Sequence, residues 1–388
     1  MGPQLRAVDD SSVFIRTRLR FAPAPEGAPD CVVQHERALH ERALHERTPN
    51  ERTLSLAPAP EALTVWAVSD GRPSVDDQVM GLAEAVARLA PAHIERKVVR
   101  WKNKSFGRRP TWMQFEPHTK LAADADPIEG PWPDLWIAAG RATLPFSLRV
   151  KRWSEGHSFV VQAQDPRWSP NRFDAVIPPR HDRVRGKNVI EITGAAHRVT
   201  PRALKRAYDH AFETFESLPR PRVGVFVGGG ARRFDVSEDR ARKLAAEIAL
   251  AVETEGGSVM LAFAPQTPEP ARDIISARLG ALPSVIWDGS GEDPRLGFLA
   301  AADYVLVSED QLGVASEAAV TGAPVFVLKI DGYDAGRRRF HEELEKLDVA
   351  RPFGGQLYRW AYEPLSETDR AAARILRRLR DRENTPAA

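Results

Sequence analysis

The sequence predicts an α/β fold of two doubly wound, Rossmann-like parallel sheets that face a central crevice. Three observations predict it. At 388 residues the chain is long enough for two domains and a remainder, at roughly 150 residues per domain. Short, fully apolar runs alternate with helical patterns from Leu63 onward, which is typical of parallel sheets covered on both faces. The alternation restarts after a stiff segment, Leu218–Pro221, which marks the predicted domain boundary.

We therefore divide the chain into four predicted segments. Residues 1–61 form a disordered, low-complexity tail, 62–218 an N-terminal domain, 219–365 a C-terminal domain, and 366–388 a final helix. In the tail, residues 35–54 repeat a five-residue unit, HERAL HERAL HERTP NERTL. Steps of five residues turn ~500° around a helix and spread His35, His40 and His45 around it, so we expect no metal site there.

The N-terminal domain begins with an apolar strand and an amphipathic helix. The helix, Gln78–Leu89, carries apolar residues at helical spacing. Residues 102–130 are polar and proline-rich, and we interpret them as an excursion from the sheet. A helix over Ala203–Ser217 leads into the boundary. The predicted strands are Leu63–Ser69, Asp134–Ala139, Ser158–Ala163, Ala175–Pro178 and Asn188–Ile192.

The C-terminal domain repeats the alternation, and one of its helices opens at Ser237 as N-cap. Its predicted strands are Arg222–Val227, Ser258–Phe263, Ser284–Trp287, Asp303–Val307 and Pro324–Leu328. Parallel sheets bind ligands at the carboxyl ends of their strands, so two such sheets in tandem leave a crevice for a ligand.

The last helix, Glu367–Arg382, is predicted to start at a capping box formed by Ser366 and Asp369. One face is apolar, and several arginines lie largely opposite it. We interpret it as a docked surface helix with a solvated cationic face. The alternative is contact with an anionic membrane surface.

The composition limits the classes of partner. Lys and Arg number 55 against 53 for Asp and Glu, which gives no argument for nucleic acid. Cys31 is the single cysteine, so no intrachain disulfide forms. No apolar run approaches the ~20 residues of a membrane span, and the first twenty residues lack a secretory h-region. We expect a cytoplasmic protein, at most peripheral to the inner face of the membrane.

The strongest local signal is a buried strand that ends in Gly228, Gly229 and Gly230. Glycines at this position let backbone N–H groups approach a phosphate, and Arg232 and Arg233 would supply formal charge. The alternative is a tight strand-to-helix turn. The contiguous glycines match neither a dinucleotide fingerprint nor a P-loop.

A second signal follows the strand at 303–307. The strand ends in a polar turn that contains Ser308, Glu309 and Asp310, and a helix that starts near Leu312 carries Ser316 and Glu317. A carboxylate at the position of Glu317 can accept two hydrogen bonds from a ribose diol. The alternative is a surface carboxylate stabilised by the helix dipole.

Five loops of the N-terminal half also end strands and are expected at the crevice. Two of them hold its candidate titrating bases, His181 beside Asp182, and His197, because histidine titrates near neutral pH. The loops also contain Gly71, Gln78, Gly140, Arg141, Asp165 and Arg167.

With these loops in hand, the chain resembles the mitochondrial-fission family named for the elongated-mitochondria phenotype of plants, and in particular its bacterial members. The resemblance runs from about Leu63 to Arg382. It rests on many ordered matches, among them Gly140–Thr143, Gln164–Arg167, Pro179–Asp182, Gly194–Val199, Gly228–Gly230, Ser316–Ala319 and Arg351–Phe353.

That family is in turn similar to the GT-B glycosyltransferases, notably the enzyme that adds N-acetylglucosamine in peptidoglycan synthesis and lipid A disaccharide synthase. The resemblance implies a nucleotide-sugar on the C-terminal domain, with Glu317 on its ribose, and an acceptor on the N-terminal domain. It also implies that the last helix crosses back onto the first domain. The acceptor-side residues would be Gly71, Gln78, Gly140, Arg141, Asp165 and Arg167.

The leading hypothesis is a metal-independent, GT-B glycosyltransferase-like protein that needs no cofactor, binds a nucleotide-sugar and transfers the sugar to a lipid or glycan hydroxyl. His181 would act as base or orienter with Asp182 as its partner. Two loops differ from the family pattern, at Ser74–Asp77 and Ala264–Pro268. These differences and the cationic last helix motivate a second hypothesis, a non-catalytic scaffold at a membrane. A nucleotide-sugar epimerase is the third.

Overall fold

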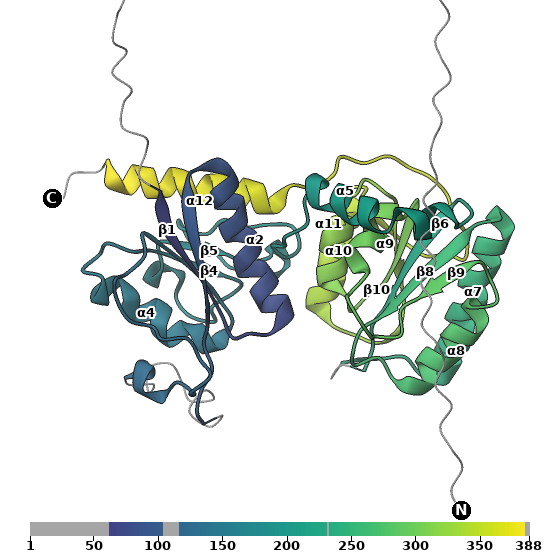
Figure 1. The fold of residues 1–388 in the computed structure, drawn as a ribbon, viewed down its shortest axis with the longest axis horizontal. Helices are drawn as coiled ribbons and strands as arrows, with labels where there is room; N and C mark the ends of the chain where they lie inside the picture. Colours follow the sequence, from purple (N-terminus) through teal and green to yellow (C-terminus); the bar gives the residue numbers. More distant parts are fainter. Residues whose placement is uncertain (1–61, 104–115, 231–232, 385–388) are drawn as a thin grey trace, which may run out of the picture. The chain divides into compact units, whose positions relative to one another are not determined.

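The computed structural model describes residues 62–103, 116–230 and 233–384, which belong to one compact unit. This unit contains two parallel β-sheets with helices on both faces, as the sequence predicts (Figure 1). The predicted tail, with its repeat and its histidines, lies outside the described residues. The domain boundaries stay a prediction.

The first sheet has five parallel strands in the order β2-β1-β3-β4-β5. Four of the predicted strands are confirmed to within one residue, because each is an apolar run buried on both faces. The bounds are β1 Leu63–Ser69, β2 Ala92–Val98, β3 Leu135–Ala139, β4 Phe159–Ala163 and β5 Ala175–Ile177.

One strand of this sheet was missed, and one predicted strand does not form. Strand β2 was not predicted because it lies at the sheet edge and carries charged residues between its apolar ones. The strand predicted at Asn188–Ile192 does not form. That segment runs beside β5 and makes only isolated bridges, from Val189 to Val176 and from Ile192 to Pro179.

The first sheet is covered by helices α2, Pro73–Leu89, and α4, Leu144–Trp153. Helix α2 starts before the predicted Gln78, because Pro73 occupies its first turn, where a missing N–H costs nothing. Short 3₁₀ helices link the strands: η2 Pro117–Lys120, η3 Arg141–Thr143, η4 Pro170–Arg172 and η5 Arg180–Asp182.

The second sheet has six parallel strands in the order β13-β11-β10-β6-β8-β9. All five predicted strands of this half are confirmed to within one residue. The bounds are β6 Arg222–Val227, β8 Ser258–Phe263, β9 Ser284–Ile286, β10 Tyr304–Ser308, β11 Val325–Leu328 and β13 Ala350–Pro352, with a separate antiparallel pair of β7 Phe234–Asp235 and β12 Asp331–Gly332.

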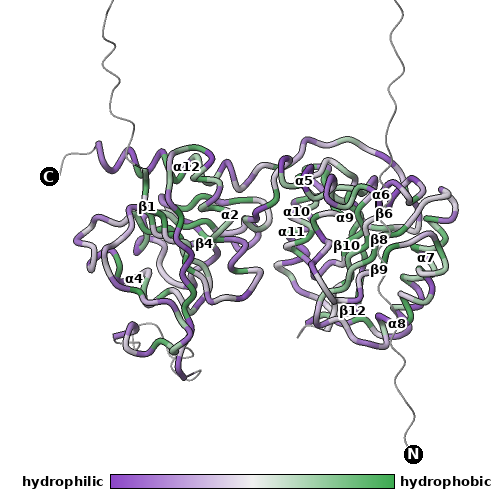
Figure 2. The backbone as a smooth tube through the Cα atoms, viewed as in Figure 1, coloured by the Kyte–Doolittle hydropathy of each residue, from purple (hydrophilic) through white to green (hydrophobic). Residues whose placement is uncertain are grey.

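The helices around the second sheet bury their apolar faces on its two sides. The hydrophobic stretches follow the strands of both sheets (Figure 2). On the second sheet, α7 and α8 cover one side, and α5, α9, α10 and α11 cover the other. The bounds are α5 Pro201–His210, α6 Phe212–Glu216, α7 Glu238–Glu255, α8 Glu269–Leu279, α9 Arg295–Ala301, α10 Leu312–Ala318 and α11 Ala335–Lys346.

Of two helix predictions in this half, one is confirmed and the other is corrected. Ser237 caps α7 as predicted, and its side chain accepts a hydrogen bond from the Arg240 N–H. The helix predicted at 203–217 is interrupted at Ala211 and forms α5 and α6. The interruption places Phe215 in the core and leaves Phe212 half exposed.

The last helix, α12, spans Glu367–Glu383 and packs beside α2 (Figure 1). Its apolar stripe, which includes Ile375 and Leu376, is buried in the core of the first sheet. The predicted capping box does not form. The Ser366 side chain makes no cap bond, and Asp369 instead pairs with Arg88 of α2.

Several arginines of α12 bind backbone carbonyls of the first half rather than facing solvent freely. Arg378 donates to Asn188 O at 2.6 Å, and Arg382 donates to His157 O at 2.7 Å. Since the apolar stripe is also buried, this helix offers no apolar face to a membrane. Among the described residues, no helix combines the length and apolarity required to cross a bilayer.

Candidate functional site

A cavity of about 760 Å³, here called the main cavity, lies at the carboxyl ends of strands from both sheets. Residues from loops of each half line it, as expected where parallel strands end. Eight of the candidate residues predicted from the sequence line this cavity: Gln78, Asp165, Arg167, His181, Asp182, His197, Asp310 and Glu317.

The glycine loop after β6 is arranged differently from the prediction. The N–H of Gly228 donates to Ser308 Oγ at 2.8 Å, and the N–H of Gly229 donates to Asp310 Oδ2 at 2.9 Å. Ser308 Oγ also donates to Asp310 Oδ1 at 2.6 Å. The two N–H groups expected to hold a phosphate therefore already bind a side-chain hydroxyl and a carboxylate.

Gly230 closes this loop against the neighbouring one. Its φ is +68°, and a Cβ there would lie 1.8 Å from the carbonyl oxygen of Gln266. Only glycine fits such a close backbone approach. The third glycine is thus explained by packing of the two loops.

Two of the predicted cofactor-binding residues have other partners. Arg233 forms an ion pair with Asp334, and Glu309 accepts a hydrogen bond from the Ile330 N–H at 3.0 Å. Neither lines the main cavity. Arg232 lies outside the described residues.

Ser316 connects the two halves. Its Oγ accepts a hydrogen bond from the Ala195 N–H at 3.0 Å and donates to Leu312 O at 2.7 Å. Ser316 does not line the main cavity, so in this structure it holds a loop of the first half against α10.

Glu317 lies near the end of α10 and faces the main cavity, where it is 7% exposed. Its Oε2 is 3.1 Å from Arg295 Nε, yet the N–H does not point at the oxygen and no hydrogen bond forms. Burial raises the pKa of Glu317 from 4.5 to about 7, against the opposing effect of the Arg295 charge. The carboxyl group is therefore partly protonated at neutral pH.

Arg295, at the start of α9, also reaches the first half. Its Nη2 is 3.9 Å from Asp77 Oδ2, and its Nη1 is 3.8 Å from Asp293 Oδ2. Burial raises the pKa of Asp77. A cluster of one arginine and three carboxyl groups thus joins α9, α10 and α2 on the cavity wall.

His181 and Asp182 do not form the predicted hydrogen-bonded pair. His181 Nε2 is 3.8 Å from Asp182 Oδ1, too far for a hydrogen bond. The ring packs on Phe340, with centroids 5.5 Å apart, and Nδ1 has no hydrogen-bond partner among the described residues. Burial, reinforced by the nearby Arg339 charge, lowers the pKa of His181 to about 4. His181 is a neutral ring at pH 7, held by packing rather than by Asp182.

His197 is equally buried on the cavity wall. Its backbone N–H donates to Thr368 Oγ1 of α12 at 3.2 Å, and its Nδ1 has no partner within the described part of the chain. Burial lowers the pKa of His197 to about 4. Both predicted bases are therefore neutral and retain an unpaired ring nitrogen.

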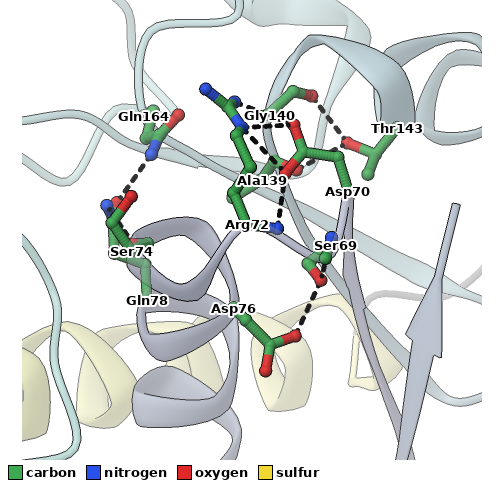
Figure 3. A network of polar contacts seen from close by, with 11 residues as sticks. Ser69, Asp70, Arg72, Ser74, Asp76, Gln78, Ala139, Gly140, Thr143 and Gln164 are labelled. Atoms are coloured by element: carbon green, nitrogen blue, oxygen red, sulfur yellow. Dashed lines mark hydrogen bonds and ion pairs between the residues drawn. The ribbon is translucent and has the colours of Figure 1, made fainter. Parts of the chain in front are cut away.

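Two of the predicted acceptor-side residues, Gln78 and Gly140, are held in place by contacts within the first half. Gln164 Nε2 donates to Gln78 Oε1 at 3.0 Å, and Gln78 Nε2 donates to Ser74 O at 2.9 Å (Figure 3). Gly140 has φ +86°, and a Cβ there would lie 3.0 Å from Asp70 Oδ2. Glycine is therefore required where the end of β3 approaches the end of β1.

The predicted acceptor-side residues other than Gln78 separate into three groups. Asp165 and Arg167 form an ion pair at 3.1 Å and line the main cavity. Gly140 and Arg141 line an adjoining cavity instead. Gly71 lines neither, because it forms the turn after β1 and donates its N–H to Ser69 Oγ.

The charges on the wall of the main cavity are mixed. Three arginines, Arg167, Arg295 and Arg337, line it together with six carboxyl groups, Asp77, Asp165, Asp182, Asp293, Asp310 and Glu317. Within the described residues, no three His, Cys, Asp or Glu side chains converge as metal ligands would. The wall thus offers both hydrogen-bond donors and acceptors, with carboxyl groups outnumbering arginines two to one, which suits a ligand with hydroxyl groups.

Sequence reasoning missed Arg295 and Arg337, the two cations of the second half on this wall. Arg295 follows Asp293-Pro294 at a helix start, and Arg337 lies in the first turn of α11. The proline-led start of α9 was the signal available for Arg295, since helix starts in such folds face the carboxyl ends of the strands.

The two doubly wound sheets, with a cavity at the carboxyl ends of their strands, define a protein of the GT-B-like fold class. A UDP-GlcNAc 2-epimerase from Methanocaldococcus jannaschii shares this fold, with a TM-score of 0.52 and 13% sequence identity over 81% of this chain and 99% of that one.

The chain belongs to the mitochondrial fission ELM1 family, which residues 74–379 match. The mitochondrial fission protein ELM1 of Arabidopsis thaliana is 32% identical over 274 residues, which are 64% of this chain and 64% of that protein. The match thus spans less than two thirds of the plant protein. An uncharacterized protein of Rickettsia prowazekii is 24% identical over 358 residues, 80% of this chain and 97% of that protein. The predicted family is confirmed.

Proposed function

We propose that the main cavity binds a nucleotide-sugar and that the protein transfers the sugar to a hydroxyl group of a lipid or glycan. The observation that carries the proposal is Glu317, a buried carboxyl group on the cavity wall with an oxygen that lacks a hydrogen-bond donor. A ribose diol would supply the missing donor. A volume of about 760 Å³ lies within the range of small-molecule sites.

The charges of the second half suit the rest of such a ligand. Arg295 and Arg337 line the same cavity and would face the diphosphate, in place of the glycine N–H groups that Ser308 and Asp310 occupy. Arg337 also lies 5.0 Å from the centre of the Phe234 ring, which restricts its position.

His181 is the group we assign to proton transfer. His181 lines the cavity, and its neutral ring has a buried Nδ1 that lacks a partner among the described residues, so the ring has a free position for the proton that an attacking hydroxyl releases. A ring with a pKa near 4 is a weak base, and an acceptor oxygen would have to lie within hydrogen-bond reach of it.

Calorimetric titration of the full chain with UDP, GDP and CMP, and with their sugar conjugates, tests the binding step. We expect micromolar affinity for one nucleotide class, and Glu317→Gln should weaken it at least about tenfold through the loss of charge-assisted hydrogen bonds. Glu213→Gln, on the exposed side of α6, is the matched control and should change nothing. A folded protein that binds no nucleotide would refute the proposal.

A non-catalytic scaffold is the second candidate, favoured by the internal bonds of the glycine loop. The two candidates differ in a direct observable. A scaffold should bind none of the nucleotides, whereas a transferase should bind its nucleotide-sugar donor and consume it when an acceptor is added. Conversion of the donor sugar without an acceptor would instead indicate an epimerase.

A further inference from the structure

A second cavity of about 380 Å³ adjoins the main cavity at the carboxyl ends of β3 and β4. Three residues, Gln164, Asp165 and Arg167, line both cavities. The other lining residues come from the segment between β3 and α4, from the start of α4, from the end of β4 and from the loop after it: Gly140, Arg141, Leu144, Gln162, Ala163, Pro166 and Trp168.

Gln162 points to a ligand in this cavity. The side chain is 1% exposed, and its Oε1 has no hydrogen-bond partner among the described residues. Its Nε2 makes only a long contact of 3.4 Å to Ala163 O. A buried amide oxygen without a donor is costly, so its presence on a cavity wall calls for a donor from a bound molecule.

The loop that follows Gln162 is held in an unfavourable backbone conformation. Gln164 has φ +70° and Arg167 has φ +53°, both in the left-handed region that non-glycine residues seldom adopt. Asp165 Oδ1 accepts the Arg167 N–H at 2.8 Å and fixes the turn. Such conformations concentrate at binding sites, where the surrounding structure maintains them.

The wall combines an apolar surface with polar groups of both kinds. Trp168, Leu144 and Pro166 provide the apolar part, and Trp168 is only partly buried. Gln162 Oε1 and the Asp165 carboxylate are acceptors, and Arg167 is a donor. A small anion offers few donors to the two acceptors and no apolar face to Trp168, whereas a ring with hydroxyl groups and an apolar face can satisfy the acceptors, the donor and the apolar wall together.

We propose that this second cavity binds an uncharged sugar ring, stacked on Trp168 with a hydroxyl group donating to Gln162. This inference rests on the proposed function in one respect: in a transferase, the ring would belong to the acceptor beside the donor in the main cavity. Binding of a free sugar does not depend on that role and can be measured alone.

The test is ligand-observed NMR on the full chain with the methyl glycosides of glucose, galactose, mannose and N-acetylglucosamine, and with inorganic phosphate as the anionic probe. We expect saturable binding of at least one glycoside with a dissociation constant on the order of millimolar. Trp168→Ala should weaken it at least tenfold, and Gln162→Leu, which keeps the side-chain size, should weaken it while leaving the melting temperature equal or higher.

Trp360→Ala, a half-buried tryptophan of the second half, is the matched control and should leave glycoside binding unchanged. Binding of phosphate alone, no binding of any glycoside, or binding that survives Trp168→Ala would each overturn the inference. The same samples are titrated with nucleotides. Glycoside binding without nucleotide binding refutes only the proposed function, and the reverse result refutes only this inference.

Discussion

Glu317→Gln should change how the stability of the protein depends on pH. The carboxyl group has an ordinary pKa of 4.5 when unfolded and a pKa of about 7 when buried in the fold. Between these values the unfolded chain releases the proton and the folded chain keeps it, so folding becomes less favourable as pH rises from 4.5 to 7. Glutamine does not ionise and does not incur this loss.

The magnitude follows from the two pKa values. Each pH unit between them is worth about 1.4 kcal/mol, and integration from pH 5 to pH 8 gives about 2–3 kcal/mol. The free energy of unfolding of Glu317→Gln, relative to the unchanged protein, should therefore rise by about 2–3 kcal/mol over that interval. The pKa of about 7 already contains the effect of the Arg295 charge, which lowers it, so this charge needs no separate correction.

Urea unfolding of both proteins at pH 5, 6, 7 and 8 measures this difference. Glu213→Gln provides the control for a glutamate exposed on α6, and its difference from the unchanged protein should stay constant. If the curves for Glu317→Gln and the unchanged protein run parallel from pH 5 to pH 8, then Glu317 ionises normally and the argument from burial is wrong.

Three further outcomes are expected. Gly230→Ala forces a Cβ to 1.8 Å from Gln266 O and should lower the free energy of unfolding by at least about 3 kcal/mol. Gly291→Ala, where φ is +71° and no atom lies within 4 Å, should lower it by only about 1 kcal/mol. Thermal melts of the two variants measure the difference. Leu376→Ala should lower stability by about 2–5 kcal/mol in urea unfolding, because the side chain is 4% exposed in the core shared with α2. The His181 ring should show constant NMR shifts from pH 8 to pH 6, and its burial as a neutral ring should destabilise the fold as pH falls from 6.5 towards 4. A titration near pH 6.5 would contradict the burial argument for His181.

The sequence predicted the fold where burial dictates the residue pattern. Apolar runs such as residues 223–227 of β6 lie between two layers of helices, and burial on both faces selects an apolar residue at nearly every position. Strand β2 lies at the sheet edge, where charged residues are tolerated, so its sequence lacks the apolar run that marks the other strands. The segment at Asn188–Ile192 is apolar because it packs beside β5, which does not require a ladder of hydrogen bonds.

The site was predictable at the level of loops rather than side chains. Strand ends had to meet at one edge of each sheet, and Glu317, His181 and Asp165 line the main cavity accordingly. Which way an arginine points depends on partners far away in the sequence. Asp334 holds Arg233 away from the cavity, and no local pattern indicates that pairing.

The position of α12 has a consequence for how the protein is made. The core beside α2 is completed by the last helix, and Arg370, Arg378 and Arg382 close hydrogen bonds to carbonyls of the first half. A ribosome synthesises the first sheet well before this helix emerges, so the nascent first half exposes apolar surface until α12 has been made. We therefore expect the second sheet, although later in sequence, to be the earlier half to reach its final packing. Premature termination would leave the first half as a target for chaperones.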